Sequence, residues 1–456
     1  MLQLNYWHDE ARANYVEMES TARTRGDRAL ELAALTARAT LHSVLSPVFD
    51  PAQAQTLSNQ ALALAHELGD RAAEAKILWN LMLLYYYTGR DSSQAVAYGE
   101  QSLALAREFQ LSEQLTYTLN DLALAYLSTG QWARALSAVD EAREMWHGQG
   151  NLPMLADNLT KTAQIHYHAG QFGPALAAAQ EMLHVCQASQ NWAQAMISGL
   201  FMGPINLAWG QPRQAIESLE EALRLGERVE HPAPEMLLRA LLGWTYGSLG
   251  ALDHALALAR PAHEEVQRSP MGAVLRPGVA GMYARLLLLK GEVAEADAAL
   301  RDTLRDFDLQ QAAISRLLSW EQTVFARVEL ALAQGKAAHA VSLASEFLNA
   351  LRQSDTRAFL TEALYLRGKA LLALGQFDQA RKALAEARAL AESMNVRLIL
   401  WPTLIALSQI EGQRGTLRDA EAQTLRTQAR AVVEYIADHS PPDFRPAFRN
   451  LPGVRT

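Results

Sequence analysis

Cysteine is almost absent from this chain of 456 residues, in which Cys186 stands alone. An internal disulfide framework is therefore excluded, and a lone thiol is typical of a reducing compartment. No apolar run approaches the ~20 residues that a membrane-spanning helix needs. A secretory signal is also missing at the amino terminus, which reads MLQLNYWHDEAR. We therefore expect a cytoplasmic protein without a membrane segment.

Positive charge is in deficit. The chain has 41 Lys and Arg against 49 Asp and Glu, a formal net charge of −8, and no run rich in Lys or Arg. Proteins that bind nucleic acids present a basic face, because neutralising phosphates supplies most of their affinity. Direct binding to nucleic acid is therefore not expected.

Catalytic and cofactor motifs are missing as well. The chain contains no GxxxxGK[ST] phosphate loop, no GxGxxG after a strand and no HExxH. The nearest metal-like cluster, His263-Glu264-Glu265, has no second histidine one helical turn later. Cys186 is expected to be a buried, inert thiol. We expect no cofactor, no metal and no enzymatic activity.

Alanine and leucine are what the chain has in quantity. Half of its residues are hydrophobic but only 7% are aromatic. Alanine and leucine favour helices, whereas the β-branched residues that favour strands are sparse. The composition predicts an all-α protein.

Glycine recurs with a period of about forty residues, in short turns such as TGQWARAL, AGQFGPAL and LGQFDQAR. Successive members are 40 to 44 residues apart, and a tenth, more degenerate break, SPVFDP, precedes the first. The nine glycines are Gly89, Gly130, Gly170, Gly210, Gly250, Gly291, Gly335, Gly375 and Gly415. Such a period predicts tandem helix–turn–helix units, with glycine ending the first helix of each pair.

Small side chains occupy fixed positions around these glycines. Alanine stands five residues after the glycine at Ala135, Ala175, Ala215, Ala255, Ala296, Ala340, Ala380 and Ala420, and six after it at Ala95. Seven residues before the glycine the side chain is usually small: Ala123, Ala163, Gly203, Gly243, Ala284 and Gly368. Small residues let two helices approach where they cross. We expect the two helices of each pair to cross at these positions.

Aromatic residues flank the turns. Tyr85, Tyr126 and Tyr246 stand four residues before a turn glycine, and Trp132, Phe172 and Phe377 stand two residues after one. We expect them to fill the space that the small residues leave. His166 occupies the same position as these tyrosines, and core packing is the expected role for it too.

The turn glycine, the aromatic after it and the later alanine resemble the tetratricopeptide repeat (TPR), as in GQWARA, GQFGPA and GQFDQA. That repeat usually spans ~34 residues, and the longer period resembles its MalT-like variant, found in bacterial signalling proteins. HEAT repeats share a period of ~40 residues but do not require this spacing of glycine and alanine. The resemblance implies a right-handed α-solenoid of about ten repeats.

The two ends differ from the repeats. Residues 1–26 are expected to form a capping helix, residues 27–438 the superhelical array and residues 439–456 a proline-rich tail. The segment before and within the tail, ARAVVEYIADHSPPDFRPAFRNLPGVR, resembles the close of helical-repeat arms on bacterial signalling ATPases and nucleotidyl cyclases. The tail is expected to fold back through Phe444, Phe448 and Leu451 over the last helix pair, with binding to a partner as the alternative. Its four prolines exclude a regular helix.

The TPR resemblance also implies where a partner would bind. First helices line the concave face, and in the family the inward positions lie thirteen, ten, six and three residues before the turn glycine. Transferred to this chain, they give a groove of Lys76, Trp79, Tyr86, Tyr117, Asn120, Asp157, Thr160, Gln164, Tyr167, Trp244, Arg285, Phe325, Glu329, Tyr365 and Lys369. Pro204 interrupts the most apolar first helix, which marks it as a hinge or ligand pocket, or as a tolerated kink.

Two functions fit this pattern. In one, the concave groove is a scaffold that binds a protein or peptide segment. In the other, the chain is the ligand-sensing regulatory arm of a signalling ATPase, cyclase or transcription activator, whose effector domain is absent from this chain. Both depend on hairpins stacked in single file, each touching only its neighbours.

Overall fold

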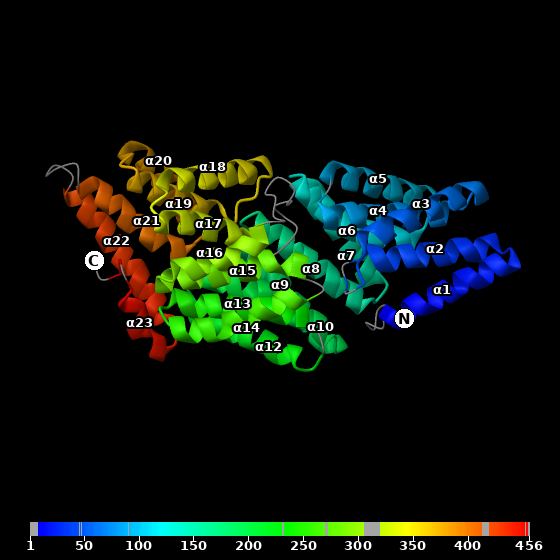
Figure 1. The fold of residues 1–456 in the computed structure, drawn as a ribbon, viewed down its shortest axis with the longest axis horizontal. Coiled ribbons are helices and arrows are strands. Elements are labelled where there is room, and N and C mark those ends of the chain that lie inside the picture. Colours follow the sequence, from blue (N-terminus) through cyan, green and yellow to red (C-terminus); the bar gives the residue numbers. More distant parts are fainter. Residues whose placement is uncertain are drawn as a thin grey trace. The chain divides into compact units, whose positions relative to one another are not determined.

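The computed structural model describes residues 8–454, apart from 45, 47, 90, 230–231, 270–271, 305–319, 413–418 and 452. Every regular element in these residues is helical, which confirms the predicted all-α solenoid. The described helices include none that is both long and apolar enough to cross a membrane. The helices are labelled in Figure 1 and form two compact units.

The first unit contains the described residues up to Lys161, and the second unit those from Thr162 onward. The boundary falls inside α8 (Leu152–His168). The helices before it are α1 (His8–Arg25), α2 (Arg28–Ser43), α3 (Pro51–Leu68), α4 (Arg71–Thr88), α5 (Ser92–Glu108), α6 (Ser112–Ser128) and α7 (Trp132–Gly148).

The second unit continues the alternation of first and second helices. Its helices after α8 are α9 (Phe172–Ser189), α10 (Trp192–Ala195), η1 (Met196–Ser198), α11 (Gly199–Ala208), α12 (Pro212–Gly226), α13 (Pro232–Ser248), α14 (Leu252–Arg268), α15 (Gly272–Lys290), α16 (Val293–Leu304), α17 (Glu321–Ala333), α18 (Ala337–Gln353), α19 (Leu360–Ala373), α20 (Phe377–Ser393), α21 (Arg397–Gly412), α22 (Asp419–Asp438), η3 (Pro442–Phe444) and α23 (Arg445–Arg449). The predicted division into cap, array and tail stays a prediction.

The turn glycines end the first helices as predicted. Eight of the nine have a positive φ, between 71° at Gly375 and 87° at Gly291, a region that disfavours side chains with a Cβ. Gly415 lies outside the described residues. Three helices of the early repeats are capped at their start by aspartate. Asp50 of α3, Asp70 of α4 and Asp91 of α5 accept hydrogen bonds from backbone N–H groups in the first turn of their helices.

The small residues mark the helix crossings. The alanines five residues after the glycine are fully buried from Ala135 to Ala380, whereas Ala420 is exposed. A Cβ added to Gly203 would lie 2.7 Å from Leu219, and one added to Gly368 would lie 2.6 Å from Leu384. Both leucines belong to the second helix of the same pair, so the predicted crossing is confirmed.

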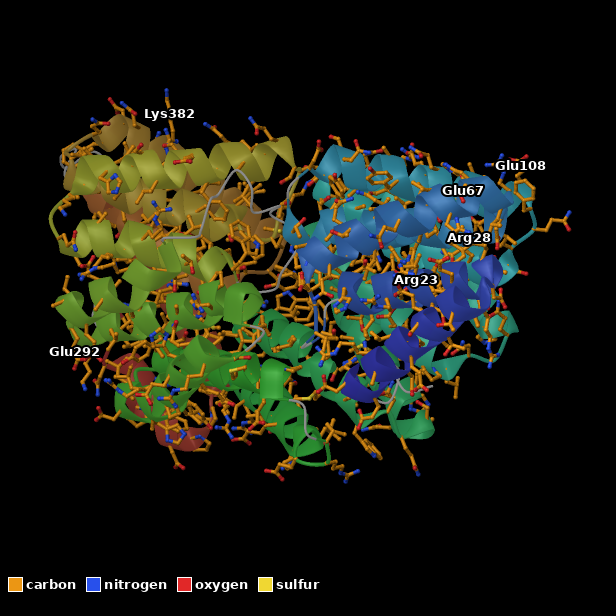
Figure 2. The ribbon with its side chains drawn as sticks, turned by 45° about the vertical axis from the view of Figure 1, so that its right-hand side comes forward. Arg23, Arg28, Glu67, Glu108, Glu292 and Lys382 are labelled. Carbon is orange, nitrogen blue, oxygen red and sulfur yellow. The ribbon has the colours of Figure 1, made fainter. Side chains whose placement is uncertain are left out.

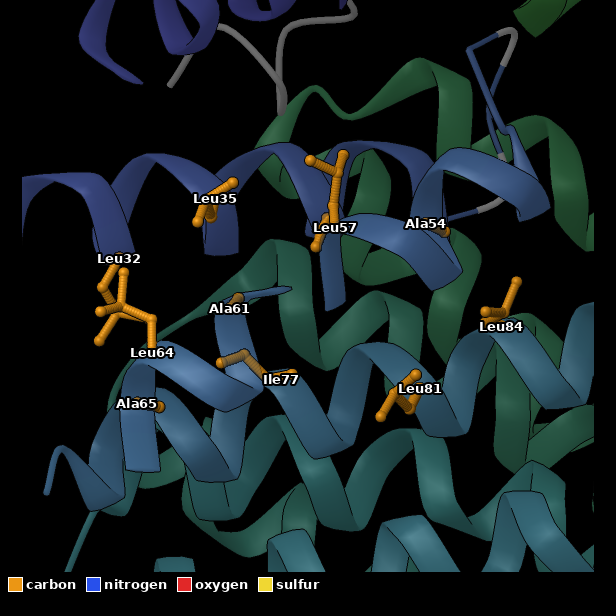
Figure 3. Packing of buried hydrophobic residues seen from close by; sticks show 11 residues of the cluster. Leu32, Leu35, Ala54, Leu57, Ala61, Leu64, Ala65, Ile77, Leu81 and Leu84 are labelled. Atoms are coloured by element: carbon orange, nitrogen blue, oxygen red, sulfur yellow. The ribbon is translucent and has the colours of Figure 1, made fainter. Parts of the chain in front are cut away.

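Leucine and alanine fill the core between successive pairs. In the first unit, Leu32 and Leu35 of α2 pack with Leu57 and Leu64 of α3 and with Leu81 of α4 (Figure 3). Their exposed fractions are between 1% and 6%. Full burial of a leucine stabilises the fold by about 1.5–3 kcal/mol relative to exposure.

Charged side chains cover the outer surfaces, including Arg28, Glu67, Glu108 and Lys382 (Figure 2). Some of them link neighbouring second helices by ion pairs, such as Arg107 with Glu141 at 2.8 Å and Arg352 with Glu386 at 2.7 Å. Exposed pairs of this kind contribute only about 0–1 kcal/mol each.

The second unit departs from single-file stacking. The backbone N–H of Arg357 donates to the His168 carbonyl at 2.8 Å, and that of Arg213 donates to the His439 carbonyl at 3.0 Å. The Arg397 guanidinium donates to the Trp209 carbonyl at 3.1 Å, across 188 positions. The prediction that each pair touches only its neighbours is therefore wrong for this unit, whose coil returns onto its own earlier turns.

The tail folds back over the last helix pair, as predicted, and also reaches an earlier turn of the second unit. Phe448 is fully buried and lies edge-on to Trp401 of α21, while Phe444 packs on Tyr246 at 5.1 Å. Leu451 lies beside the Gly250 turn. A one-turn helix, α23, forms in spite of the prolines, because Pro446 stands in its first turn, where the missing N–H has no helical acceptor.

Two smaller expectations also changed. Phe377 is 39% exposed and does not fill a gap in the core. The first helix that contains Pro204 is divided into α10, η1 and α11, and the 3₁₀ turn ends directly before Gly199. The Pro204 ring crowds the backbone carbonyl of Leu200, four residues earlier in the helix. The tighter 3₁₀ turn lies directly before this crowded position.

Candidate functional site

The first helices of neighbouring repeats contact each other directly, α2 with α4 and α4 with α6 in the first unit, and α13, α15, α17 and α19 in series in the second. Together they form the inner layer of each unit. Side chains that point away from the second helices therefore line an inner face, and each unit has a network of polar side chains there.

The first unit buries a lysine among two carboxylates. The Nζ of Lys161 lies 3.3 Å from Asp121 Oδ1 and pairs with Asp157 one turn earlier in α8. Trp79 Nε1 donates to Asp121 Oδ2 at 2.8 Å from the neighbouring repeat. We call Trp79, Asn120, Asp121, Asp157 and Lys161 the Lys161 network.

Amide groups complete the Lys161 network. Asn120 Nδ2 donates to Asp157 Oδ2 at 2.8 Å, and Asn158 donates to Asn120 Oδ1 at 3.0 Å. Burial alone would lower the pKa of Lys161, but Asp157 and Asp121 outweigh it and raise that pKa. Burial raises the pKa of Asp121, although Lys161 opposes the shift. The network is held together mainly by the lysine charge.

The second unit buries an arginine among carboxylates. Arg285 of α15 is 3% exposed and donates to both carboxylate oxygens of Glu329, at 2.9 and 3.1 Å, and to Glu362 of α19. It also donates to Gln322, whose amide donates in turn to Glu321 Oε1 at 3.2 Å. We call Arg285, Glu321, Gln322, Glu329 and Glu362 the Arg285 network.

Aromatic rings surround the Arg285 network. The guanidinium lies over the Trp244 ring at 4.0 Å and near the Phe325 ring at 5.3 Å. A close approach of α15 and α17 makes this possible: a Cβ on Gly281 would lie 2.3 Å from the backbone nitrogen of Thr323. Glycine at this inner position therefore allows Gln322 to reach Arg285.

The carboxylates of this network are in an unfavourable environment. Glu321 is 3% exposed, and its Oε2 has no hydrogen-bond donor among the described residues. Burial raises the pKa of Glu321 to about 7, and burial also raises the pKa of Glu362. Three glutamates share a single arginine, so part of the negative charge is not neutralised.

An aromatic cluster lies on the same inner face at the end of α8. The Tyr167 ring contacts Phe172, Phe201 and Phe359 with centroids 5.4 to 6.4 Å apart. His168 is fully buried, its Nδ1 bonds the Gln164 carbonyl at 2.8 Å, and burial lowers its pKa to about 4. The ring is therefore neutral at physiological pH.

The structure brings together many of the predicted groove residues, but it buries several of them. Trp79 and Tyr117 have centroids 6.0 Å apart, and Lys369 lies 5.6 Å from the Tyr365 ring. The buried members are Trp79, Tyr86, Asn120, Gln164, Arg285 and Phe325. The half-buried members are Tyr117, Asp157, Thr160, Tyr167, Trp244, Glu329 and Tyr365, and the exposed ones are Lys76 and Lys369.

Sequence reasoning missed the residues that complete the two networks. Glu362 and Gln322 stand thirteen residues before Gly375 and Gly335, so the register rule already covered them. Asp121 and Lys161 stand nine residues before their glycines, a position that the rule omits. A charged residue at the same place in two successive repeats was the available signal.

Two predictions concerned reactive side chains. Cys186 is fully buried, as predicted, and burial raises its pKa to about 12; its lack of reactivity stays a prediction. His166 is only half-buried and hydrogen-bonds Gln171 at 2.7 Å, so core packing does not describe it.

A family model for the MalT-like TPR region matches residues 82–343. A search of curated protein sequences finds no match. Among solved structures, a Rap protein complexed with competence and sporulation factor is 14% identical, with a TM-score of 0.47 over 90% of this chain and 99% of that one. BtubC from P. vanneervenii is 20% identical, with a TM-score of 0.42 over 48% and 91% of the two chains.

Proposed function

Because this chain belongs to the family of proteins with a MalT-like TPR region, we propose that it binds a protein or peptide segment on the inner faces of its repeats and catalyses no reaction. The observation that carries the proposal is the pair of inner-face networks. Each network lies on a layer of first helices that also carries half-buried aromatic side chains, Tyr117 in the first unit and Tyr365 in the second.

Such side chains suit an extended peptide. Tyr117, Asp157 and Thr160 in the first unit and Glu329 and Tyr365 in the second offer ring faces, hydroxyls and carboxylates. Their orientations are fixed by packing, as with Tyr117, which lies edge-on to Trp146 at 5.1 Å. Preorganised side chains lose little entropy when a ligand binds. We propose a cytoplasmic location, in keeping with the single buried thiol.

A display library of random nonapeptides tests the proposal, because it samples every kind of side chain in an extended segment. Lys369→Trp adds a bulky ring at an inner position of α19, and Lys382→Trp makes the same change on the outer helix α20, at a residue labelled in Figure 2. We expect the inner variant to lose the selected peptides and the outer variant to keep them. Equal binding by both variants would contradict an inner-face site.

A regulatory arm is a second proposal, which the closed coil of the second unit favours. Its early turns bond its later ones, as in the contact between Trp209 Nε1 and the Met394 carbonyl at 3.3 Å. A ligand inside the coil would therefore change the distance between the two segments. Pro204 and the 3₁₀ turn ahead of it would provide a hinge.

Distance measurements separate the two roles. Spin labels at Glu227→Cys and Glu392→Cys would report on the coil, since both residues are exposed and the native Cys186 is too buried to react. A regulatory arm predicts that a selected peptide changes the distance. A passive scaffold predicts an unchanged distance at saturating peptide.

A further inference from the structure

The Arg285 network is short of positive charge. Glu321, Glu329 and Glu362 come from α17 and α19. In the described residues Arg285 from α15 pairs with Glu329 and Glu362 and acts on Glu321 only through its charge. Glu329 and Glu362 already share the Arg285 donors, with side-chain exposures of 25% and 19%. Arg285 therefore has few N–H donors left for Glu321.

Glu321 is the unpaired member. One of its oxygens accepts from Gln322, and the other, Oε2, is buried with no donor in the part of the chain that the structure describes. A buried carboxylate that lacks a partner destabilises the fold if it stays charged. Its electrostatic neighbours are Glu362, which repels it, and Arg285, which attracts it. Burial raises the pKa of Tyr167 of α8, and the charges of Glu321 and Glu362 add to that shift. The Tyr167 hydroxyl therefore lies near both carboxylates.

We propose that this network receives a lysine or arginine side chain of the bound peptide, with the cation placed between Glu321 and Glu362. The proposal rests on the peptide-binding function above and names the chemical class of its ligand. The cation would give Glu321 Oε2 its missing donor and neutralise a second glutamate. The half-buried Tyr365 ring would contact the aliphatic stem.

The approach is from the solvent side of the inner face. Glu329 and Glu362 are partly exposed, whereas Glu321 is almost completely buried. A long, flexible side chain with a terminal charge reaches such a position, and a backbone amide does not. Lysine and arginine have this shape.

The test uses peptides selected from the random nonapeptide library with the full chain. The selected peptides are resynthesised with an acetylated amino terminus, so that only side chains carry positive charge. Each lysine is replaced by norleucine and each arginine by citrulline, which keep the stem and remove the charge. We expect one such replacement to weaken binding by about tenfold or more, as for loss of a charge-assisted hydrogen bond.

Variants of the chain locate the effect. In Glu321→Gln the difference between the charged and neutral peptides is expected to fall below about threefold. Glu346→Gln, an exposed glutamate of α18, is the matched control and should keep the full difference. Helicity and melting temperature are measured for both, so that unfolding is distinguished from lost recognition.

A second readout follows the proton. Since Glu321 is largely protonated below pH 7 in the free protein, binding of a cation at pH 6 should release a proton. Calorimetry in two buffers of different ionisation enthalpy measures that release, which Glu321→Gln should abolish. Spermidine as a competitor shows whether a free amine enters the site as well.

The outcomes are distinct. Selected peptides that need no positive charge, or a charge preference that survives in Glu321→Gln, would overturn the inference and leave peptide binding intact. No selection of any peptide above a scrambled control would overturn the proposed function itself.

Discussion

The two units solve the same problem, burial of a cation on an inner face, in different ways. In the described part of the first unit the longest side-chain hydrogen bond spans 42 positions, from Trp79 to Asp121. In the second unit such bonds span up to 227 positions, from Arg213 to Ser440. In the described part of the first unit, side-chain hydrogen bonds therefore link neighbouring repeats. In the second unit they also link turns that are far apart in the sequence.

The charge balance differs in the same direction. Lys161 faces two aspartates, and one of them, Asp157, is 36% exposed and can be hydrated. Arg285 faces three glutamates, of which Glu321 is almost completely buried. The Lys161 network needs almost no further positive charge, whereas the Arg285 network does. We therefore expect the two networks to respond differently to the same kind of change.

The largest effect is expected from Arg285→Met. It leaves three glutamates without their cation, and breaking a buried pair in this way costs about 3–5 kcal/mol. Lys161→Met, the matched change in the first unit, should cost less because Asp157 remains accessible to water. Urea denaturation at pH 8, followed by hydrogen exchange of α4–α8 and α15–α19, measures both. A greater loss for Lys161→Met would reverse the comparison.

Phe448→Ala tests whether the coil is closed by its tail. Removing a buried phenylalanine costs about 3–5 kcal/mol, and the lower end applies to a single helical turn near the chain end. Because the tail lies on the Gly250 turn, amide exchange should accelerate at α13 and α14 as well as at α23. Leu57→Ala, in the stacked unit, should affect only α2, α3 and α4.

Exchange confined to α22 and α23 in Phe448→Ala would show that the tail does not stabilise distant turns. Acceleration beyond α4 in Leu57→Ala would show that the first unit is not locally coupled.

Glu321→Gln is expected to stabilise the protein in a defined pH window. The pKa of Glu321 is about 7 in the folded protein, against an ordinary 4.5. Between these values the unfolded chain has released the proton and the folded chain retains it, so stability falls as pH rises through the window. At pH 8 the variant should be more stable by about 2–3 kcal/mol, and at pH 4 the two proteins should be alike. Thermal melts at the two pH values measure this.

His168 gives the opposite dependence in the same unit. Its folded pKa of about 4 lies below the ordinary 6.5, so protonation of the unfolded chain lowers stability as pH falls between these values. Melts of Glu321→Gln must therefore be compared with the wild-type chain at each pH. A variant that gains nothing at pH 8 would contradict the unpaired state of Glu321.

Overpacking a helix crossing should cost the same in both units. Ala135→Leu and Ala296→Leu replace fully buried alanines at equivalent crossings, and the added methylenes should cost about 1–3 kcal/mol each. Urea midpoints give the values. An unaltered midpoint for either variant would show that its crossing can widen without strain.

Local rules predicted the fold well because each repeat is specified by its own residues. The positive φ of Gly130 and the burial of Ala135 follow from the needs of one turn and one crossing. The closure of the second unit could not be predicted in this way. The closure depends on the superhelical pitch, which is the sum of small rotations between successive helix pairs. No short sequence motif specifies that pitch.

The inner face was predicted in outline and missed in detail. The register rule found Arg285 and Glu329, but it could not show that they pair and so bury each other. Pairing depends on the distance between α15 and α17, and that distance depends on Gly281. Lys161 was missed because it stands nine residues before Gly170, a position that the register rule does not include.

The smallest effects are expected on the outer faces, where the two units are alike. Arg107→Ala in the first unit and Arg352→Ala in the second each remove an ion pair between successive second helices, with arginine side chains that are 53% and 47% exposed. Water screens such pairs, so each loss should be below about 1 kcal/mol and should diminish with added salt. Thermal melts at two salt concentrations that differ about tenfold, 0.05 and 0.5 M, measure how much of each stability loss depends on salt. A larger, salt-insensitive loss for Arg352→Ala alone would mean that the coil of the second unit depends on its outer helices as well as on its inner network.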